Sequence, residues 1–276
     1  MNIVTFTDPN CPWAYFAEAS RLALRWTYGD QIHWSRAYVV IAEHVGQSEA
    51  TGFTPEVEAE EDRQIAVETG MPLWTDARKR ITTSLRPSLA AVAARSLDAE
   101  EPLLRALWRR SRALGEAIDE PLVLRAAVED AGVDSDRLAE RMRDPAVMRR
   151  LRQEMEAART PAAPARHLRH KLGGRGTRYS SPSWELQVGD RTLVAPGFQP
   201  LESYETLLAN HAPELKRADP PERVEQVLSW AAMPLATAEV AAVARRPLAA
   251  VRAELEAVAD FAPAGSDGFW AAREIA

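Results

Sequence analysis

The sequence predicts an α/β protein in which two strand-containing segments flank a long helical one. A β-branched run at residues 2–7, a helical pattern and a second apolar run together predict a βαβ unit. Apolar alternation around a Gly-Asp turn, followed by another helical pattern, predicts a ββα unit near residue 200. Between the two units, apolar residues recur every three to four positions, which predicts helices.

The composition is that of an ordinary globular protein, since 46% of the 276 residues are hydrophobic and 27% are charged. A formal net charge of −6 removes any general electrostatic attraction to nucleic acid or to an anionic membrane. The N-terminus lacks the pattern of a secretory signal, and no run of about eighteen apolar residues occurs. Cys11 is the only cysteine, which fits a reducing compartment because one thiol cannot build a disulfide framework. We therefore expect a cytoplasmic protein without a membrane partner.

Residues 1–42 are the expected βαβ unit. The breaker DPNCP ends the first strand, and the helix that follows has apolar residues close to one face, at Phe16, Ala19, Ala23 and Trp26. Residues 31–41 alternate at first and then become continuously apolar, as a buried parallel strand does.

Residues 43–167 are expected to be a helical insertion. Helical spacing of apolar residues runs through the stretches 54–70, 84–99, 100–118, 120–133 and 134–160. No strand pattern interrupts these stretches. The arginine-rich run LWRRSR at residues 107–112 is typical of a solvated helix face.

Residues 168–218 are the expected ββα unit. Trp184, Leu186 and Val188 alternate before the Gly-Asp turn, and a second short apolar run follows it at Leu193 and Val194. The helix after this hairpin carries its apolar residues on one face, at Leu201, Tyr204, Leu207 and Leu208.

Residues 219–276 are separate in composition. Helical stretches at 222–232, 236–244 and 247–261 precede a hairpin-like segment, which is the order of a winged-helix domain. Three arginines could meet phosphates there, but acidic residues crowd the same helix (Arg245, Arg246 and Arg252 against Glu254, Glu256 and Asp260). DNA is therefore not an expected partner, and packing on the body or on a protein partner is favoured.

Two motifs about 170 residues apart match one family in the same order. DPNCPWAYF at residues 8–16 resembles the D-P-x-C-P-W-C active-site segment of cytoplasmic DsbA-family oxidoreductases. SSPSWELQVGDRTLVAPGFQPLESYETLL at residues 180–208 resembles their proline loop, hairpin and final helix. The chain thus resembles the DsbA-like thioredoxin family over about residues 1–218. The resemblance implies a thioredoxin-like fold with an inserted helical domain, to which the winged-helix-like unit is appended.

The same resemblance takes in the kappa-class glutathione transferases and the 2-hydroxychromene-2-carboxylate isomerases, whose active-site segment has serine in place of the nucleophilic cysteine. This chain keeps Cys11 but departs from the redox members at the second cysteine, where it has Ala14. Its active-site motif is C-P-W-A.

Cys11 is the candidate nucleophile. A helix N-terminus favours an anion, so a cysteine just before a helix is placed to react as its thiolate. Pro12 fits the first helical position, where no backbone N–H is needed. The alternative is that Cys11 is a small buried apolar residue.

Ala14 excludes the dithiol mechanism, because a mixed disulfide on Cys11 cannot be resolved within the chain. Monothiol exchange remains, with glutathione or mycothiol as the external thiol, and it is the favoured function. One alternative is a kappa-like glutathione- or mycothiol-dependent transferase or isomerase, in which the cofactor thiol does the chemistry. The other is a non-enzymatic, redox-responsive adaptor or regulator. An enzyme is favoured over that last alternative.

The resemblance also implies a set of residues around the bound thiol. Pro182 is the expected cis-proline facing Cys11, and the backbone of Ser181 pairs with a peptide-like thiol substrate. Further expected contacts to the thiol cosubstrate are Pro12, Trp13, Ala14 and Gln199. Two roles are possible for Asp8, a proton relay or a hydrogen-bond acceptor that fixes the loop. The second role is favoured, because a carboxylate beside a thiolate raises the pKa of the thiol.

Partners and cofactors follow from these assignments. The expected partner is a small thiol or a thiol-bearing substrate, with no tightly bound cofactor, and a homodimer is left open. The one H-x-x-H pair, His167 and His170, has no carboxylate or cysteine at ligand spacing, so no metal site is expected.

Overall fold

The computed structural model describes residues 1–168, 172–173 and 176–273. Its central sheet has the strand order β2-β1-β5-β6. Strand β1 (Asn2–Thr7) runs parallel to β2 (His33–Tyr38) and antiparallel to β5 (Ser183–Val188), which pairs with β6 (Arg191–Ala195). The α/β fold class is thereby confirmed, because the two strand-containing segments of the chain meet in one sheet.

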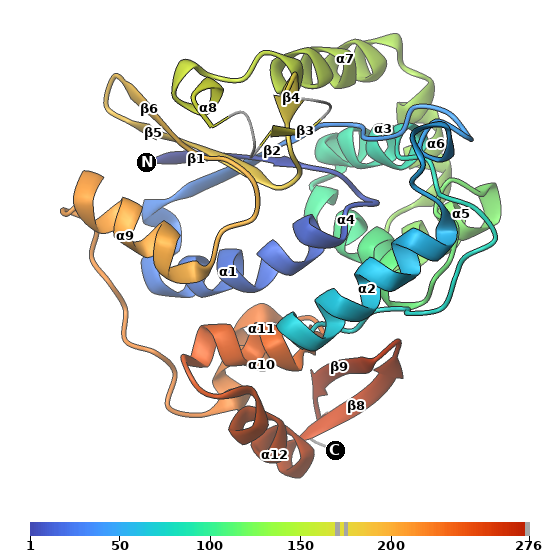
Figure 1. The fold of residues 1–276 in the computed structure, drawn as a ribbon. Helices are drawn as coiled ribbons and strands as arrows, with labels where there is room; N and C mark the ends of the chain where they lie inside the picture. The colour runs from blue at the N-terminus through green and yellow to red at the C-terminus, as the bar shows by residue number, and fades with distance from the viewer. Residues whose placement is uncertain (169–171, 174–175, 274–276) are drawn as a thin grey trace.

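Both faces of β1 are buried, which explains its β-branched and aromatic composition. Ile3 on one face packs with residues of α1 (Pro12–Tyr28) and α9 (Leu201–His211). Phe6 on the other face packs with residues of α7 (Pro145–Arg159) and α8 (Ala163–Arg166). Figure 1 shows α1 and α9 below the sheet and α7 and α8 above it. Cys11 lies between the end of β1 and the start of α1, the helix that covers one face of the sheet.

The insertion is helical, as the spacing of its apolar residues predicts. The 3-10 turn η1 (Gly29–Gln31) lies before the insertion, between α1 and β2. The insertion contains the 3-10 turn η2 (Glu49–Thr51), α2 (Pro55–Thr69), α3 (Leu85–Ala94), η3 (Arg95–Leu97), α4 (Glu100–Trp108), the π-helical segment η4 (Arg109–Ala113), α5 (Pro121–Asp130), α6 (Ser135–Arg143), α7 and α8. Short strands β3 (Leu172–Gly173) and β4 (Arg178–Tyr179) follow it and pair with each other.

The helical stretch expected at residues 134–160 is in fact two helices. Pro145 begins α7, and Asp144 before it has an extended backbone with φ −65° and ψ 119°. The Asp144 carboxylate accepts a hydrogen bond of 2.8 Å from the backbone N–H of Ala146 and so caps α7. A proline cannot continue a helix because it lacks the N–H, and it also holds the preceding residue extended.

The C-terminal unit contains α10 (Val224–Ala231), β7 (Leu235–Ala236), α11 (Thr237–Ala244), α12 (Leu248–Val258), β8 (Ala259–Ala264) and β9 (Asp267–Ala272). Its three strands form a sheet of order β7-β9-β8. The helices and the hairpin follow the order expected from the sequence, whereas the two-residue strand β7 had no sequence signal. That the unit belongs to the winged-helix class stays a prediction.

The C-terminal unit is packed closely on the body. Leu22 and Ala23 of α1 share one apolar cluster with α10, α11 and α12, and α11 lies against α1 in Figure 1. A buried ion pair joins Arg105 of α4 to Glu239 of α11 through hydrogen bonds of 2.8 and 3.0 Å. The C-terminal unit is therefore joined to the body by a shared apolar cluster and by a buried ion pair.

The turn between β8 and β9 is docked on the insertion. The backbone N–H of Ser266 donates to the carbonyl of Leu73 at 2.8 Å, and the Leu73 N–H donates to Ser266 Oγ at 3.1 Å. Gly265 beside it has a φ of +53°, and a Cβ there would lie 2.4 Å from the Leu73 carbonyl. A side chain at residue 265 is therefore excluded both by its own backbone and by its neighbour.

We expect Gly265→Ala to lower the free energy of unfolding by at least about 2 kcal/mol, combining left-handed backbone strain with the steric clash against Leu73. Gly189→Ala is the matched control, because Gly189 also has a positive φ, +61°, but nothing lies within 4 Å of its Cβ position. Urea denaturation of both variants measures the difference. Equal losses in the two variants would contradict the docking role of this turn.

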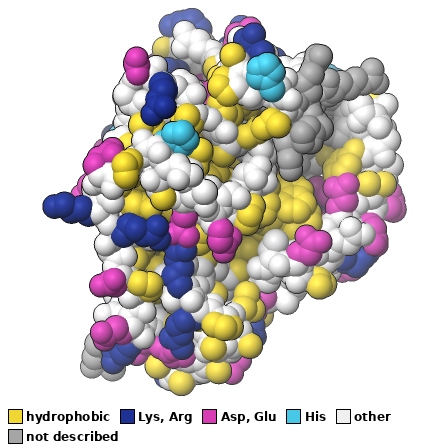
Figure 2. Space-filling model, turned by 60° about the vertical axis from the view of Figure 1, so that its left-hand side comes forward, with side chains coloured by type: hydrophobic (Ala, Val, Ile, Leu, Met, Phe, Trp, Pro, Cys, Tyr) yellow, Lys and Arg dark blue, Asp and Glu magenta, His cyan; other side chains and the backbone are white. Residues whose placement is uncertain are grey.

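The three arginines that the sequence analysis considered as phosphate contacts, Arg245, Arg246 and Arg252, all form ion pairs. Arg245 binds Glu205 through two hydrogen bonds of 2.8 Å. Arg246 pairs with Glu254 at 2.6 Å, and Arg252 pairs with Glu256 and Asp267. Figure 2 shows acidic and basic side chains intermixed on the face that it presents. That DNA is not a partner stays a prediction.

Candidate active site

Cys11 is the N-cap residue of α1. Its backbone is extended, with φ −89° and ψ 118°, and Pro12 takes the first helical position. The Cys11 N–H donates to the Asp8 carbonyl at 3.1 Å, and the Cys11 carbonyl accepts from the Tyr15 N–H at 3.2 Å. The thiol therefore lies at the positive end of a 17-residue helix.

The proline loop faces this thiol. The Ser181–Pro182 peptide bond is cis, the isomer that the family resemblance implies. The Cys11 thiol donates a hydrogen bond to the carbonyl oxygen of Ser181, with 3.1 Å between Sγ and O. Ser183 fixes the loop, since its hydroxyl donates to the Ser180 carbonyl at 2.7 Å and accepts from the Gly197 N–H at 3.0 Å. Two segments 170 residues apart in sequence thus form one site.

Aromatic side chains form one wall beside Cys11. The ring of Trp13 lies 5.2 Å from that of Phe198 and 5.8 Å from that of Phe16, measured between centroids. Trp13 and Phe198 are partly buried against the apolar cluster that contains Cys11. Phe198 was missed by sequence reasoning, although it lies inside the G-x-Q-P motif. Gln199 in the same motif uses its amide to donate to the Pro196 carbonyl at 2.8 Å, within its own loop.

Ala14 occupies the position of the second cysteine of the redox motif. It is 2% exposed and belongs to the same apolar cluster as Cys11. The site is therefore built around a single thiol, with a methyl group where the resolving thiol would be.

Asp8 fixes the loop that carries Cys11. Its carboxylate accepts backbone hydrogen bonds from Asn10 at 2.8 Å and from Ile41 at 2.7 Å. Its carbonyl accepts from the indole N–H of Trp108 at 3.1 Å. Burial raises the pKa of the Asp8 carboxyl, while the hydrogen bonds from Ile41 and Asn10 oppose the rise. The contacts support the loop-fixing role that the sequence analysis favours.

A buried arginine lies behind the active-site loop. Arg112 in η4 is 0% exposed and donates to the Asn10 side chain at 2.9 Å and to Glu58 of α2 at 3.0 Å. The Asn10 side-chain oxygen also accepts a hydrogen bond from the Ser111 hydroxyl at 2.8 Å, and the Asn10 side-chain NH2 donates to the Thr82 carbonyl at 2.8 Å. The expectation that residues 107–112 form a solvated face is therefore wrong for Arg112, because acidic partners from α2 allow its burial.

Burial raises the pKa of the Cys11 thiol, which is only 5% exposed. Hydrogen bonds at Ser181 and then at Ala14 are the next largest effects, and both lower the thiol pKa. The charge of Asp8 raises the pKa, and the charge of Arg112, the smallest of these effects, lowers it. The net direction is upward, so the resting site holds a protonated thiol. This corrects the expectation of a stabilised thiolate and favours the alternative given with it, that Cys11 is a buried residue.

We expect alkylation of Cys11 in the native protein to titrate above about pH 8.5, the ordinary value for a thiol. A folded-state pKa above the unfolded value adds stability that is complete below the unfolded pKa and is lost as pH rises through the folded pKa. Stability should therefore fall above about pH 8.5, and Cys11→Ser should remove this part of the fall. Iodoacetamide rates from pH 6 to 11 test the titration, and a plateau reached below pH 8 would contradict it.

Among the described residues, no group of three or more His, Cys, Asp or Glu side chains is arranged to hold a metal ion. His170 of the H-x-x-H pair lies outside the described residues. No helix in the part of the chain that the structure describes combines the length and apolarity needed to cross a bilayer.

Comparison with protein families matches residues 2–162 to the DsbA-like thioredoxin domain. The chain belongs to this family. Its solved structural relatives include a putative protein disulfide isomerase from Nitrosomonas europaea, with 14% identity and a TM-score of 0.60 over 77% of this chain and 98% of that one. The cytosolic disulfide reductase DsbM from Pseudomonas aeruginosa matches with 23% identity and a TM-score of 0.54, over 76% of this chain and 100% of its own.

A 2-hydroxychromene-2-carboxylate isomerase has the same fold, with 14% identity and a TM-score of 0.50 over 78% of this chain and 97% of that one. No curated protein matches the sequence significantly. These solved structures share the fold of the family to which the chain belongs.

Proposed function

We propose that this DsbA-like protein is a monothiol oxidoreductase in which Cys11 exchanges with a substrate disulfide and an external small thiol resolves the product. The observation that carries the proposal is the 3.1 Å contact between Cys11 Sγ and the carbonyl of Ser181, in a chain without a second cysteine. This contact places the sulfur beside the loop that a thiol substrate would pair with.

The reaction runs in two balanced exchanges. Cys11 attacks one sulfur of the substrate R–S–S–R′, forms the mixed disulfide Cys11–S–S–R and releases R′–SH, which takes the proton of the Cys11 thiol. A small thiol G–SH then attacks the R sulfur, forms G–S–S–R and returns Cys11 to its thiol. The net change converts R–S–S–R′ and G–SH into R′–SH and G–S–S–R, so the external thiol supplies the reducing equivalents.

Glutathione or mycothiol is the proposed cosubstrate. DsbM, a structural relative, has also been solved with GSH. In this chain, Pro12, Trp13, Ala14, Ser181, Pro182 and Gln199 are the proposed contacts to the bound thiol. The partly buried ring of Trp13 beside Phe198 would offer it an apolar wall. The cytoplasm is the proposed location, because this reaction needs a compartment rich in reduced small thiols.

Burial of Cys11 favours a second candidate. A protonated, nearly inaccessible thiol is a slow nucleophile, whereas the N-terminus of α1 can stabilise the thiolate of a bound cofactor. This is the kappa-like transferase or isomerase reaction, and a 2-hydroxychromene-2-carboxylate isomerase shares the fold. In that reaction Cys11 would not form a covalent intermediate.

Turnover of 2-hydroxyethyl disulfide with glutathione, compared between the native chain and Cys11→Ser, tests the proposal. Monothiol exchange predicts glutathione-dependent turnover that falls at least about a thousandfold in the variant, since the nucleophile is lost. Comparable turnover by Cys11→Ser would favour the cofactor-thiol reaction instead. If the native chain neither turns over the disulfide nor binds glutathione, both enzymatic functions are wrong and the non-enzymatic adaptor is favoured.

A further inference from the structure

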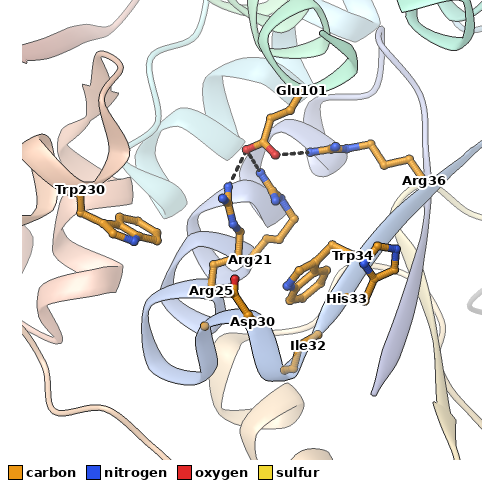
Figure 3. A pocket seen from close by; sticks show the side chains of 10 residues that line it. Arg21, Arg25, Asp30, Ile32, His33, Trp34, Arg36, Glu101 and Trp230 are labelled. Carbon is orange, nitrogen blue, oxygen red and sulfur yellow. Dashed lines mark hydrogen bonds and ion pairs between the residues drawn. The ribbon is translucent and has the colours of Figure 1, made fainter. Parts of the chain in front are cut away.

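A separate cavity of about 360 Å³ lies between the body and the C-terminal unit (Figure 3). The residues that carry the argument come from α1 (Arg21 and Arg25), β2 (Trp34 and Arg36), α4 (Glu101) and α10 (Trp230). Arg25 is fourteen positions beyond Cys11, which corresponds to about 20 Å along the axis of α1. The cavity is thus at the other end of that helix from the thiol.

Arginine and glutamate side chains form ion pairs in the cavity. Arg21 donates to Glu18 and to Glu101 at 2.7 Å, and Arg25 donates to Glu101 at 2.7 Å. Arg36 approaches the same carboxylates only to 3.8 and 3.9 Å. Three guanidinium groups therefore share these two carboxylates, and Asp30 is a third carboxylate in the lining.

Other charged groups lie close to this cluster. Arg105 lies 3.7 Å from Glu18 but is hydrogen-bonded to Glu239, which balances its charge. Asp30 and His33 also line the cavity, and both are exposed to solvent. Solvent screens an exposed carboxylate such as Asp30 far more than it screens a buried group.

Arg36 forms only long ion pairs with these carboxylates. Its side chain is 8% exposed, and its Nη2 atom has no hydrogen-bond acceptor. In Figure 3 its guanidinium group points towards Glu101, and a dashed line marks the ion pair between them. Leaving a charged donor buried without an acceptor costs free energy, so a second anion at this point would be stabilised.

Trp34 offers a second unsatisfied donor in the same cavity. Its indole N–H is buried and has no acceptor, and the ring packs edge-on against Trp184 at 5.2 Å between centroids. Trp230 from the C-terminal unit stands on the other side, with the guanidinium of Arg25 5.7 Å from its ring centroid. The two indole rings are the aromatic groups of a lining that is otherwise mostly polar.

We propose that this cavity binds a small molecule that carries a carboxylate or phosphate group and a planar apolar part. The oxyanion takes the hydrogen bonds that Arg36 and Trp34 leave unmade. The planar part lies between Trp34 and Trp230. A volume of about 360 Å³ is at the lower end of the range for small-molecule sites, which suits a compact ligand.

Calorimetric titration of the full chain at low ionic strength with inorganic phosphate, phenyl phosphate and benzoate tests the proposal. We expect phenyl phosphate or benzoate to bind with a stoichiometry of one, and Arg36→Met to weaken binding at least tenfold. Arg125→Met is the control, because it removes one positive charge from an exposed pair on α5 and should leave the affinity unchanged. Tighter binding of phenyl phosphate assigns the ligand to phosphates, and tighter binding of benzoate assigns it to carboxylates.

Failure of all three probes to bind at millimolar concentration, or unchanged affinity in Arg36→Met, would overturn the proposal. If Arg36→Met does not fold, Trp230→Leu decides, because Trp230 is 37% exposed and its replacement should be tolerated. That variant should lose affinity for the ring-bearing probe at least fivefold and keep its affinity for inorganic phosphate. Equal affinities for the ring-bearing probe in Trp230→Leu and the native chain would overturn the placement of the planar part beside Trp230.

Discussion

Replacing Ala14 by cysteine is expected to convert the single-thiol site into one that resolves its own mixed disulfide. Ala14 is buried in the same apolar cluster as Cys11, three residues on in the first turn of α1. That spacing brings the two Cα atoms within the range that a disulfide spans. An intramolecular thiol acts at an effective concentration far above millimolar, so the adduct on Cys11 should disappear more than about tenfold faster than with millimolar glutathione.

The lifetime of the adduct is measured by quenching at intervals and recording the intact mass. Ala17→Cys is the matched control, because Ala17 is also buried on α1 but lies six positions from Cys11, about 9 Å along the helix axis. It should leave the lifetime unchanged. If Ala14→Cys behaves like this control, Ala14 does not occupy the place of the resolving thiol.

Replacing Arg112 by methionine is expected to have a large effect on stability and a smaller effect on the thiol. Arg112 is buried with Glu58 and Asp62, and Arg78 would then be their one remaining buried cationic partner among the described residues. Removing one member of a buried ion cluster costs roughly 3–5 kcal/mol. The pKa of Cys11 should also rise further, because Arg112 is the nearby charge that lowers it.

Urea denaturation and the pH profile of Cys11 alkylation measure these two effects. Arg125→Met, which removes an exposed charge, should change neither. Arg112→Lys keeps the charge but loses the fork that binds Asn10 and Glu58, so it should recover part of the pKa effect and little of the stability. An unchanged alkylation profile in folded Arg112→Met would show that the arginine supports the loop without acting on the thiol.

The sequence predicts the frame of the active site well, because local patterns determine it. The β-branched run of β1, the Gly-Asp turn between β5 and β6, and the cysteine before Pro12 are each visible within a few residues. The break between α6 and α7 was also visible, at Pro145. It was missed because the apolar spacing continues on both sides of that proline.

The rest depends on contacts between distant residues. Arg112 is buried because Glu58, 54 positions earlier, reaches it, and no local pattern distinguishes such an arginine from a solvated one. The pKa of Cys11 is set by the packing that closes over α1, whereas the sequence shows only the helix N-terminus. The cavity at Arg36 and Trp34 needs Trp230 from the C-terminal unit, and the sequence leaves open whether that unit packs on the body or on a partner.

Mass spectrometry of the intact protein after exposure to a small disulfide tests the central claim, that Cys11 carries the exchange, most directly. The native chain should gain one thiol adduct at Cys11, and glutathione should remove it while forming the glutathione mixed disulfide of the small thiol. Cys11→Ser should gain none. A native chain that turns over the disulfide without ever carrying an adduct on Cys11 would contradict the account.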